Sequence, residues 1–391
     1  MFKIAKYYKI FRGRNNGDNM ARYKGKHRKK LRFKKMNLVL LFSIIYSIIV
    51  LYQVISIDIL PTKYVIAAVG AYTIINLVFL LLINVKKKLL RAFFFIFLVL
   101  FCDINIIGNY YINKTFSFLK TSFGSSENVE GPTEAYNILI SGHDFDNFRD
   151  FNMILTVNVT KQTVLMTSIP RDYYIEVVGY GQKDKLSFIR QGINVTSDSL
   201  AKLFDINIDY YLDIDTTSVV TLVDTIGGIE YYNEYPEYWS THAQVLDTYD
   251  DSTGSKLHVV HGWQHLNGIQ VLTVSRERTK LPGGDRARQK NVQDLMSGIF
   301  KKMASPEIIT KFDSVLTAVD GMYETTVPMA NVTAIIKDTM ANGNNWKIDQ
   351  QSVDGSDGHA SVNLGHGTDW VMFPNQETVD KAKVKIQEAL K

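Results

Sequence analysis

The stretch Ser168-Ile-Pro-Arg-Asp172 decides how the soluble part of the chain is expected to fold. It closes an apolar run, residues 163–169, that predicts a buried β-strand. Because Pro170 has no N–H to donate to a sheet, the strand is expected to end there. Arg171 and Asp172 then emerge at the carboxyl end of this strand, which is the edge where ligands bind in open α/β sheets.

A second predicted strand runs antiparallel to the first. Residues 152–159 form another apolar run, and Thr160-Lys161 follows it just before the strand at 163–169. Such a short connection predicts a hairpin. The start of the second strand, with Arg149 and Asp150, is therefore expected beside the end of the first.

A third predicted strand, residues 136–141, runs out into Gly142-His-Asp144. If this strand is parallel to the one at 163–169, Asp144 reaches the same edge of the sheet. Carboxylates and arginines would then converge on one spot. That combination suits a metal-bound phosphate better than a neutral ligand.

The second half of the sequence carries another group of arginines. The segment Arg276-Glu-Arg278 precedes a strongly amphipathic helix that begins at Asp285. Asp285 is expected to cap this helix, which places Arg288 in its first turn, where free N–H groups attract anions. Taken alone, this charged run is better interpreted as a solvated surface than as a phosphate site. Together with Arg171 and the carboxylates, it predicts a second part of one phosphate site.

The charge of the 391-residue chain is divided between two parts. The first 91 residues carry 19 basic and 2 acidic residues, a net charge of +17. The remaining residues carry 25 basic and 37 acidic residues, a net charge of −12. The two parts are therefore expected to face different environments. The single cysteine, Cys102, excludes a disulfide framework and a cysteine-based metal site.

Three apolar runs, residues 37–57, 64–85 and 92–112, are each long enough to cross a bilayer as a helix. The positive-inside rule predicts that the basic tail at residues 1–36 and the basic turn at 86–91 lie in the cytoplasm. With three spans, everything that follows lies outside the cell. The tail is expected to rest on anionic membrane lipids. Nucleic-acid binding is the alternative for such a basic tail, and it is not expected, because the rest of the chain lies across the membrane from DNA.

The remainder predicts a linker and one domain. Residues 113–135 are rich in Ser, Gly, Asn and Thr and predict a linker, and residues 136–391 predict an α/β domain with a mixed central sheet flanked by helices. Helices are expected near 197–205, 217–226, 309–319, 329–340 and 376–390, and further strands at 210–214 and 370–373.

Two features of the middle of the chain bear on ligands. Residues 233–257 predict a long loop, and loops of this length are often functional. His258, His261 and His265 could gather a metal if they lay on one helix. Gly262 breaks the helical pattern, so no metal site is expected there.

These motifs resemble the LytR-CpsA-Psr family of cell-wall glycopolymer transferases. The three N-terminal apolar runs resemble the CpsA-like branch of that family, although the short linker leaves no room for an accessory domain. The motifs that carry the resemblance are Asn137 to Asp144, Arg149 to Leu155, Ser168 to Asp172, Leu266-Asn-Gly268, Arg276-Glu-Arg278 and Gly283 to Arg288.

The resemblance implies a multi-pass membrane enzyme of the Gram-positive cell surface, with its catalytic domain outside. Such an enzyme transfers a glycopolymer (capsular, exopolysaccharide or teichoic-acid-like) from a polyprenyl-pyrophosphate carrier to peptidoglycan by Mg²⁺-assisted phosphoryl transfer, with a pyrophosphatase side activity. The lipid lies in an apolar groove under the sheet. The residues implied are Arg149, Arg171, Arg276, Arg278 and Arg288 for binding the pyrophosphate, Asp144 and Asp150 for the metal, and Arg171, Arg276, Arg278 and Asp285 for catalysis.

In one motif the chain departs from the family. The family usually reads Arg-Ser-Asp-Thr-Met where this chain reads Arg149-Asp-Phe-Asn-Met153. The usual metal aspartate falls on Phe151, and Asp150, one residue earlier, would point to the other face of a regular strand. Either a bulge brings Asp150 back or the metal site is weakened. A weakened site favours an alternative function, a catalytically weak homologue that binds lipid-linked polymer and regulates or scaffolds its assembly.

Overall fold

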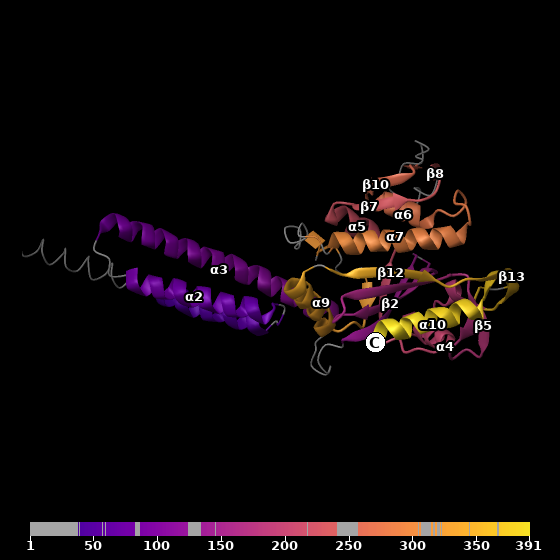
Figure 1. Cartoon of the computed structure of the whole chain (residues 1–391), viewed down its shortest axis with the longest axis horizontal. Coiled ribbons are helices and arrows are strands. Elements are labelled where there is room, and N and C mark those ends of the chain that lie inside the picture. The colour runs from indigo at the N-terminus through magenta and orange to yellow at the C-terminus, as the bar shows by residue number, and fades with distance from the viewer. Residues whose placement is uncertain are drawn as a thin grey trace, which may run out of the picture. The chain divides into compact units, whose positions relative to one another are not determined.

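The computed structural model of the chain is shown in Figure 1. It divides into two compact units, residues 1–114 and 115–391, which are described separately. The structure describes residues 38, 40–56, 58, 60–82, 87–123, 134–144, 146–216, 218–240, 257–303, 305, 314–315, 317–318, 321, 323–343, 345–365 and 367–391. The predicted basic tail at 1–36 lies outside these residues.

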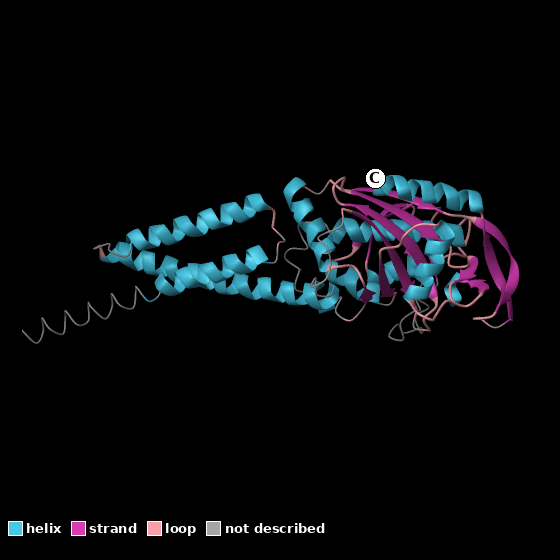
Figure 2. Ribbon diagram, turned by 90° about the horizontal axis from the view of Figure 1, so that it is seen from below, coloured by secondary structure: helices cyan, strands magenta, loops and turns pink. Residues whose placement is uncertain are grey.

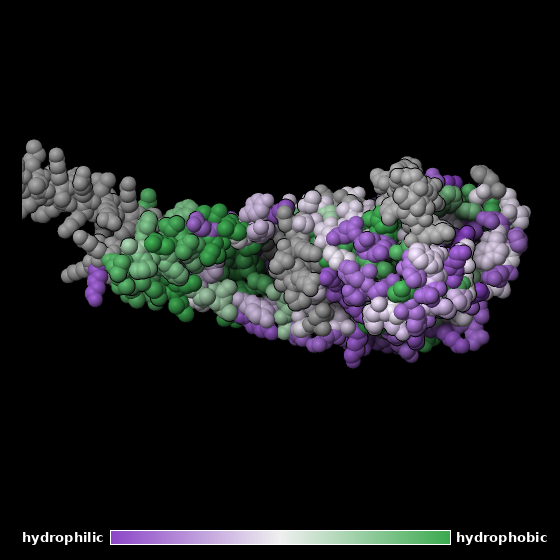
Figure 3. Space-filling model, turned by 90° about the horizontal axis from the view of Figure 1, so that it is seen from above, coloured by the Kyte–Doolittle hydropathy of each residue, from purple (hydrophilic) through white to green (hydrophobic). Residues whose placement is uncertain are grey.

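The N-terminal unit contains apolar helices. Helix α2 (Thr62–Leu82) and the segment Ala92–Lys114 of α3 (Lys88–Phe123) are long and apolar enough to cross a membrane, and Leu40–Ser56 is a shorter apolar helix. Their side chains give this unit the apolar surface seen in Figure 3. A pair of candidate spans agrees with the predicted runs at 64–85 and 92–112, while a span at 37–57 stays a prediction.

Side-chain amides and aromatic rings join the helices of this unit. Asn76 on α2 donates to Ser47 Oγ at 3.2 Å, and Asn109 on α3 donates to Tyr46 Oη at 2.7 Å. The ring of Phe79 packs edge-on against Phe94. In lipid, such polar contacts and close packing are what hold helices together, because lipid tails are as apolar as the helix surfaces.

The predicted linker is wrong at its start. Helix α3 continues through Asn113 to Phe123, whereas a linker was expected from residue 113. The physical reason is that residues 113–123 contain no glycine or proline, so their polar composition alone does not end the helix.

A six-stranded mixed sheet lies at the centre of the C-terminal unit, which confirms the predicted α/β class. The hairpin is confirmed, because β2 and β3 pair antiparallel, and β1 is also antiparallel to β2. Strands β1 and β3 therefore point the same way, and their carboxyl ends meet at one edge. The order of the sheet is β11 (Tyr323–Thr325), β6 (Tyr210–Asp215), β1 (Ala135–His143), β2 (Arg149–Asn158), β3 (Thr163–Ile169) and β12 (Lys347–Ser352).

Helices cover both faces of this sheet (Figure 2). One face packs against α4 (Ile193–Phe204) and α10 (Gln376–Leu390), and the other packs against α7 (Asp285–Met303) and α9 (Met329–Asn342). Alternating side chains of β1 serve the two cores, since Leu139 faces α4 and α10 while Ile140 faces α7 and α9. The described strands of the sheet are thus packed on both faces.

A second core lies on the outer side of α7. Helices α5 (Ser218–Ile226) and α6 (Gly268–Arg276) pack with α7 and with strand β7. Asn267 caps α6 through a reciprocal capping box with Gln270. The strands of this region are β7 (Ile229–Asn233) with β10 (Gly262–Leu266) and β8 (Tyr238–Ser240) with β9 (Leu257–Val259).

Short strand pairs elsewhere are β4 (Tyr174–Val177) with β5 (Gln182–Lys185), which leads into the 3₁₀ helix η1 (Leu186–Phe188), and β13 (Gly355–Val362) with β14 (Gly367–Pro374). Of these pairs, the predicted strand at 370–373 is confirmed within β14, and the other strands were not predicted. The predicted loop at 233–257 is wrong where β8 forms, and residues 241–256 lie outside the described part of the chain. Most of the predicted helix at 309–319 also lies outside it.

Candidate functional site

A cavity of about 280 Å³ opens between the edge of the sheet and helices α5, α6 and α7. Its mouth is charged and its depth is apolar. The charged and polar lining residues are Asp144, Asp150, Arg171, Thr216, Ser275, Arg276, Arg278 and Arg288. The apolar lining residues are Phe151, Val219, Val271, Leu272, Val292, Leu295, Met296 and Ile299.

A β-bulge explains how Asp150 reaches this cavity. Gly142 pairs with Phe151 across the β1–β2 ladder, but His143 pairs with Arg149, so the register shifts and Asp150 has no partner. The extra residue lets Asp150 and Phe151 line the same cavity, although neighbours on a regular strand face opposite ways. Of the two alternatives for the displaced aspartate, a bulge or a weakened metal site, the structure has the bulge.

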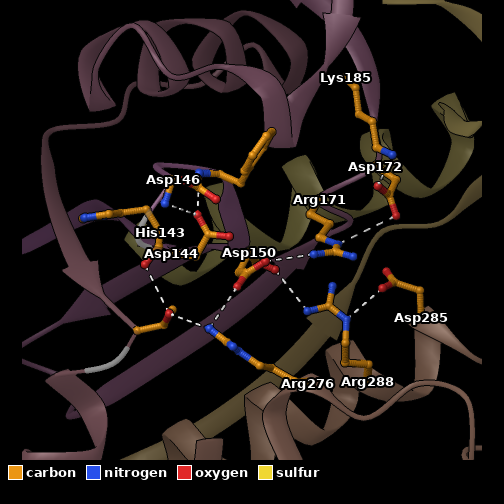
Figure 4. A network of polar contacts seen from close by, with 12 residues as sticks. His143, Asp144, Asp146, Asp150, Arg171, Asp172, Lys185, Arg276, Asp285 and Arg288 are labelled. Carbon is orange, nitrogen blue, oxygen red and sulfur yellow. Dashed lines mark hydrogen bonds and ion pairs between the residues drawn. The ribbon is translucent and has the colours of Figure 1, made fainter. Parts of the chain in front are cut away.

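Asp150 lies between arginines from three elements, as Figure 4 shows. Arg171, just after β3, contacts Asp150 Oδ1 at 2.8 Å, and Arg276, at the end of α6, contacts Oδ2 at 3.7 Å. Arg288 Nη1, from the first turn of α7, donates to the carbonyl oxygen of Asp150 at 3.0 Å. The chain thus gathers at one point the arginines that the sequence placed far apart.

Some of the donors of these arginines have no acceptor. The Nε atoms of Arg171 and Arg276 are buried and find no hydrogen-bond partner among the described residues, and Arg171 Nε has only the 4.0 Å ion pair with Asp172 Oδ2. Buried donors are nearly always satisfied in proteins. Arginine donors left open at the mouth of a cavity are suited to phosphate oxygens, which accept several such bonds at once.

Asp285 holds Arg288 in place. Its Oδ1 accepts from Arg288 Nε at 2.7 Å, and its Oδ2 accepts from Gln289 at 3.1 Å. Burial alone would raise the pKa of Asp285, but the charge and hydrogen bond of Arg288, with smaller contributions from Gln289 and Arg171, hold that pKa below its ordinary value. Asp285 is the first residue of α7 rather than its cap, and it does not line the cavity.

Arg278 is the exposed member of the group. It lines the cavity and makes no ion pair with any residue that the structure describes. The loop that carries it is shaped by Glu277, which is fully buried and whose Oε1 accepts the backbone N–H groups of Thr279 at 2.9 Å and Lys280 at 3.0 Å. Sequence reasoning missed Glu277, since a glutamate between two arginines gives no sign of burial.

The structure does not bring Arg149 to the cavity. Because the bulge turns it to the opposite face of the sheet from Phe151, Arg149 is buried and ion-paired with Asp213 on β6. His143 contacts the same carboxylate at 3.1 Å. The expectation that Arg149 joins the other arginines at the mouth is therefore corrected: it lies in a buried charge pair that joins β1, β2 and β6.

The carboxylates offer limited ligands for a metal. Within the described part of the chain, no group of three or more His, Cys, Asp or Glu side chains could hold an ion. Asp144 Oδ1 accepts the N–H groups of Asp146 and Phe148, which leaves Oδ2 without a hydrogen bond to a described residue. Both oxygens of Asp150 face arginines. The residues fit a Mg²⁺ ion that takes one carboxylate oxygen from Asp144 and its other ligands from phosphate and water, which is how Mg²⁺ is often bound.

The histidines of the middle region do not form a metal site. His258 stacks on Trp239 with ring centroids 4.4 Å apart, and His265 contacts Glu230 at 2.8 Å on the β7–β10 pair.

The apolar wall was seen in the sequence but assigned to the core. The repeat along α7 that includes Val292, Leu295 and Ile299 predicted a packing face, and part of that face lines the cavity instead. Val219 on α5 and Leu272 on α6 complete the wall and carried no signal of their own. Only the crossing of three helices over one edge of the sheet reveals them as lining residues.

Comparisons with known proteins agree with this fold. The sequence profile of the LytR-CpsA-Psr family matches residues 108–388. The polyisoprenyl-teichoic acid–peptidoglycan teichoic acid transferase TagU of Bacillus cereus (strain AH820) is 28% identical over 235 residues, which are 58% of this chain and 73% of that protein. The TagU of Enterococcus faecalis (strain ATCC 700802 / V583) is 28% identical over 280 residues, 68% of this chain and 87% of that protein.

The solved structure of Bacillus subtilis TagV has the same fold. It superposes with a TM-score of 0.53 at 21% identity and covers 66% of this chain and 98% of that one. Because the family profile spans most of the chain, from the end of α3 into α10, the chain belongs to the LytR-CpsA-Psr family.

Proposed function

We propose that the chain transfers a glycopolymer from a polyprenyl-pyrophosphate carrier to peptidoglycan. The observation that carries this proposal is the cavity itself, which joins an arginine-lined mouth to an apolar interior. A ligand that fits both parts has a charged phosphate group attached to a long apolar chain. The names of the TagU relatives point to the same class, a polyisoprenyl-linked polymer and a peptidoglycan acceptor.

The apolar wall is suited to the lipid. Val219, Leu272 and Ile299 come from three different helices and leave a space that their own side chains do not fill. Apolar surface of this kind gains roughly 25 cal/mol for each Å² that a lipid covers. An isoprenoid tail would therefore bind there, with its pyrophosphate held at the mouth.

The arginines are suited to the chemistry of the pyrophosphate. In the proposed reaction, an acceptor hydroxyl forms a P–O bond to the phosphorus that carries the glycan, the anhydride bond breaks, and polyprenyl phosphate leaves. Phosphoryl transfer depends mainly on positioning and on neutralising charge. The open Nε donors of Arg171 and Arg276, and the exposed Arg278, would supply that charge.

Mg²⁺ is part of the proposal. Asp144 would hold it through Oδ2, and the ion would neutralise charge on the phosphate oxygens when bound. Asp150 can become a second ligand only by leaving Arg171 and Arg276. A pyrophosphatase side activity, in which water replaces the acceptor hydroxyl, belongs to the same proposal.

The membrane part of the chain agrees with a lipid-linked substrate. We propose that the apolar helices anchor the chain with the basic tail on anionic lipids of the cytoplasmic face and the C-terminal unit outside the cell. The polymer is a teichoic acid, as in the names of the TagU relatives, or a capsular or exopolysaccharide chain, as the apolar N-terminal helices suggested.

One observation favours a second function. Phe151 occupies the position where the family motif usually has a metal-binding aspartate, and its ring lines the cavity. A chain with a weak metal site could bind the lipid-linked polymer and regulate or scaffold its assembly without rapid transfer.

The two functions are separated by one experiment. The purified full-length chain is incubated in detergent with a lipid-linked glycopolymer, peptidoglycan and Mg²⁺, and release of polyprenyl phosphate is followed by mass spectrometry. Transfer predicts release that is faster with the acceptor than without it and is lost in Arg276→Ala. Binding of the lipid without any release, under conditions where a TagU relative turns over, would favour the regulatory function.

A further inference from the structure

The carboxylate of Asp150 already occupies the space between the two arginines of the mouth. Its Oδ1 lies 2.8 Å from Arg171 Nη1, and its Oδ2 lies 3.7 Å from Arg276 Nη2 (Figure 4). A carboxylate and a phosphate offer arginine the same kind of acceptor, two or more anionic oxygens in a plane or tripod. A phosphate that binds both arginines therefore has to take the place of this side chain.

The backbone around Asp150 allows that exchange. The residue is the unpaired one of the β-bulge, so no strand register fixes the direction of its side chain. Its carbonyl oxygen is held by Arg288, which keeps the main chain in place while the side chain moves. The side chain is 18% exposed and contacts the arginines alone among the described residues, so its departure leaves no other described group without a partner.

We propose that Asp150 is an internal counter-anion which the phosphate ligand must displace, and that it thereby decides which anions the cavity accepts. This inference rests on the proposed use of the cavity for a pyrophosphate. It makes Asp150 a specificity-determining residue of that site.

The carboxylate of Asp150 competes strongly with a free anion because it is attached to the chain. A group fixed by a short connection competes at an effective concentration of the order of millimolar or more. A single phosphate makes only the arginine contacts that Asp150 already makes. Its binding is therefore hardly more favourable than that of the Asp150 carboxylate. A pyrophosphate reaches further, because its second phosphoryl group can contact Arg278, which has no ion pair among the described residues. Asp150 thus lowers the affinity for every anion of the site, and an anion that also reaches Arg278 is the one that still binds.

The test measures anion binding by the full-length chain in detergent and metal-free buffer. Isothermal titration calorimetry gives the Kd for inorganic pyrophosphate and for inorganic phosphate. Asp150→Asn keeps the shape of the side chain and removes its charge, and Asp150→Glu keeps the charge. Asp146→Asn is the matched control, because it makes the same change in net charge at an exposed position of the neighbouring loop that does not line the cavity.

Asp150→Asn should bind pyrophosphate about tenfold more tightly than the unaltered chain, a change equal to one charge-assisted contact. It should bind phosphate more tightly by about the same factor, because both anions have to displace the same side chain. Asp150→Glu and Asp146→Asn should stay within about twofold of the unaltered chain.

Three results would overturn the inference. If Asp150→Asn weakens pyrophosphate binding, Asp150 organises the arginines rather than competing for them. If the Kd values do not change, its carboxylate does not occupy the ligand position. If neither protein binds pyrophosphate, the mouth is not an anion site. The outcome is separate from the proposed function, since tighter anion binding by Asp150→Asn in a chain that transfers no polymer would refute the transferase and keep the counter-anion.

Discussion

The ring of Phe151 lies directly against Gly142, its partner across the β1–β2 ladder. A Cβ atom added to Gly142 would be 2.0 Å from Cε1 of that ring and 2.5 Å from Cδ1. Two non-bonded carbon atoms cannot lie this close. The ring of Phe151 in its present position therefore requires a glycine at position 142. The ring in turn forms part of the cavity wall.

Replacing Gly142 with alanine should therefore force the Phe151 ring toward the cavity. Overpacking of this kind costs roughly 1–3 kcal/mol, and we expect a lower midpoint of thermal unfolding, measured by circular dichroism. The double variant Gly142→Ala/Phe151→Ala should recover most of the loss, because the clash is removed. If Gly142→Ala unfolds at the same temperature as the unaltered chain, the ring does not lie where the structure places it.

Arg149→Ala and Arg276→Ala should affect different properties, the first stability and the second pyrophosphate binding. Arg149→Ala leaves Asp213 buried beside only His143, and the loss of one partner of a buried pair costs roughly 3–5 kcal/mol. Arg276→Ala should keep the unfolding midpoint and lose pyrophosphate binding, and Arg276→Lys should rescue poorly because lysine lacks the planar fork. A stable Arg149→Ala protein that no longer binds pyrophosphate would return Arg149 to the site, as the sequence predicted.

The pair of Asp285 and Arg288 predicts a pH dependence. The pKa of Asp285 in the folded chain lies below its ordinary value, so the unfolded chain binds the proton more readily. The stabilisation is therefore complete above the unfolded pKa of about 3.9 and is lost as the pH falls through the lower folded value. The free energy of unfolding of the unaltered chain should exceed that of Asp285→Asn at pH 7, and the gap should close at acidic pH. A gap that stays constant down to pH 3 would contradict this assignment.

The displaced metal motif gives a prediction about Mg²⁺. Asp144→Asn should abolish Mg²⁺-dependent cleavage of the pyrophosphate bond, because it removes the one carboxylate oxygen left open at the mouth. Phe151→Asp restores the usual family residue and should raise the affinity for Mg²⁺, measured by calorimetry, unless loss of the ring destabilises the strand. A folded Phe151→Asp protein with no gain in affinity, together with an active Asp144→Asn, would show that the site does not use metal through these residues.

Sequence alone predicted the elements whose pattern is local. The apolar run at 163–169, its proline and the short connection before it were enough for β3, the hairpin and the edge where Arg171 emerges. The helix at 376–390 matches α10, because its amphipathic period and its asparagine cap lie within one short segment. These features depend on neighbours in the chain, which a sequence displays.

Features set by distant parts of the chain were not predictable. β12 joins the sheet beside β3 after a separation of nearly half the chain, and its polar sequence gave no strand signal. Arg149 was wrongly assigned to the mouth of the cavity. The direction of its side chain depends on where the bulge lies in the ladder, and the sequence does not show that position. The cavity wall requires the crossing of α5, α6 and α7 over the sheet, which no single segment encodes.

The central claim is that this cavity holds a polyprenyl-pyrophosphate lipid by its arginines and its apolar wall. The direct test is mass spectrometry of the lipids that co-purify with the full-length chain in detergent, compared with the Arg171→Ala/Arg276→Ala double variant. We predict polyprenyl phosphate or pyrophosphate in the unaltered chain and a large loss of it in the folded double variant. An unaltered chain without polyprenyl lipid, or equal amounts in both proteins, would contradict the account.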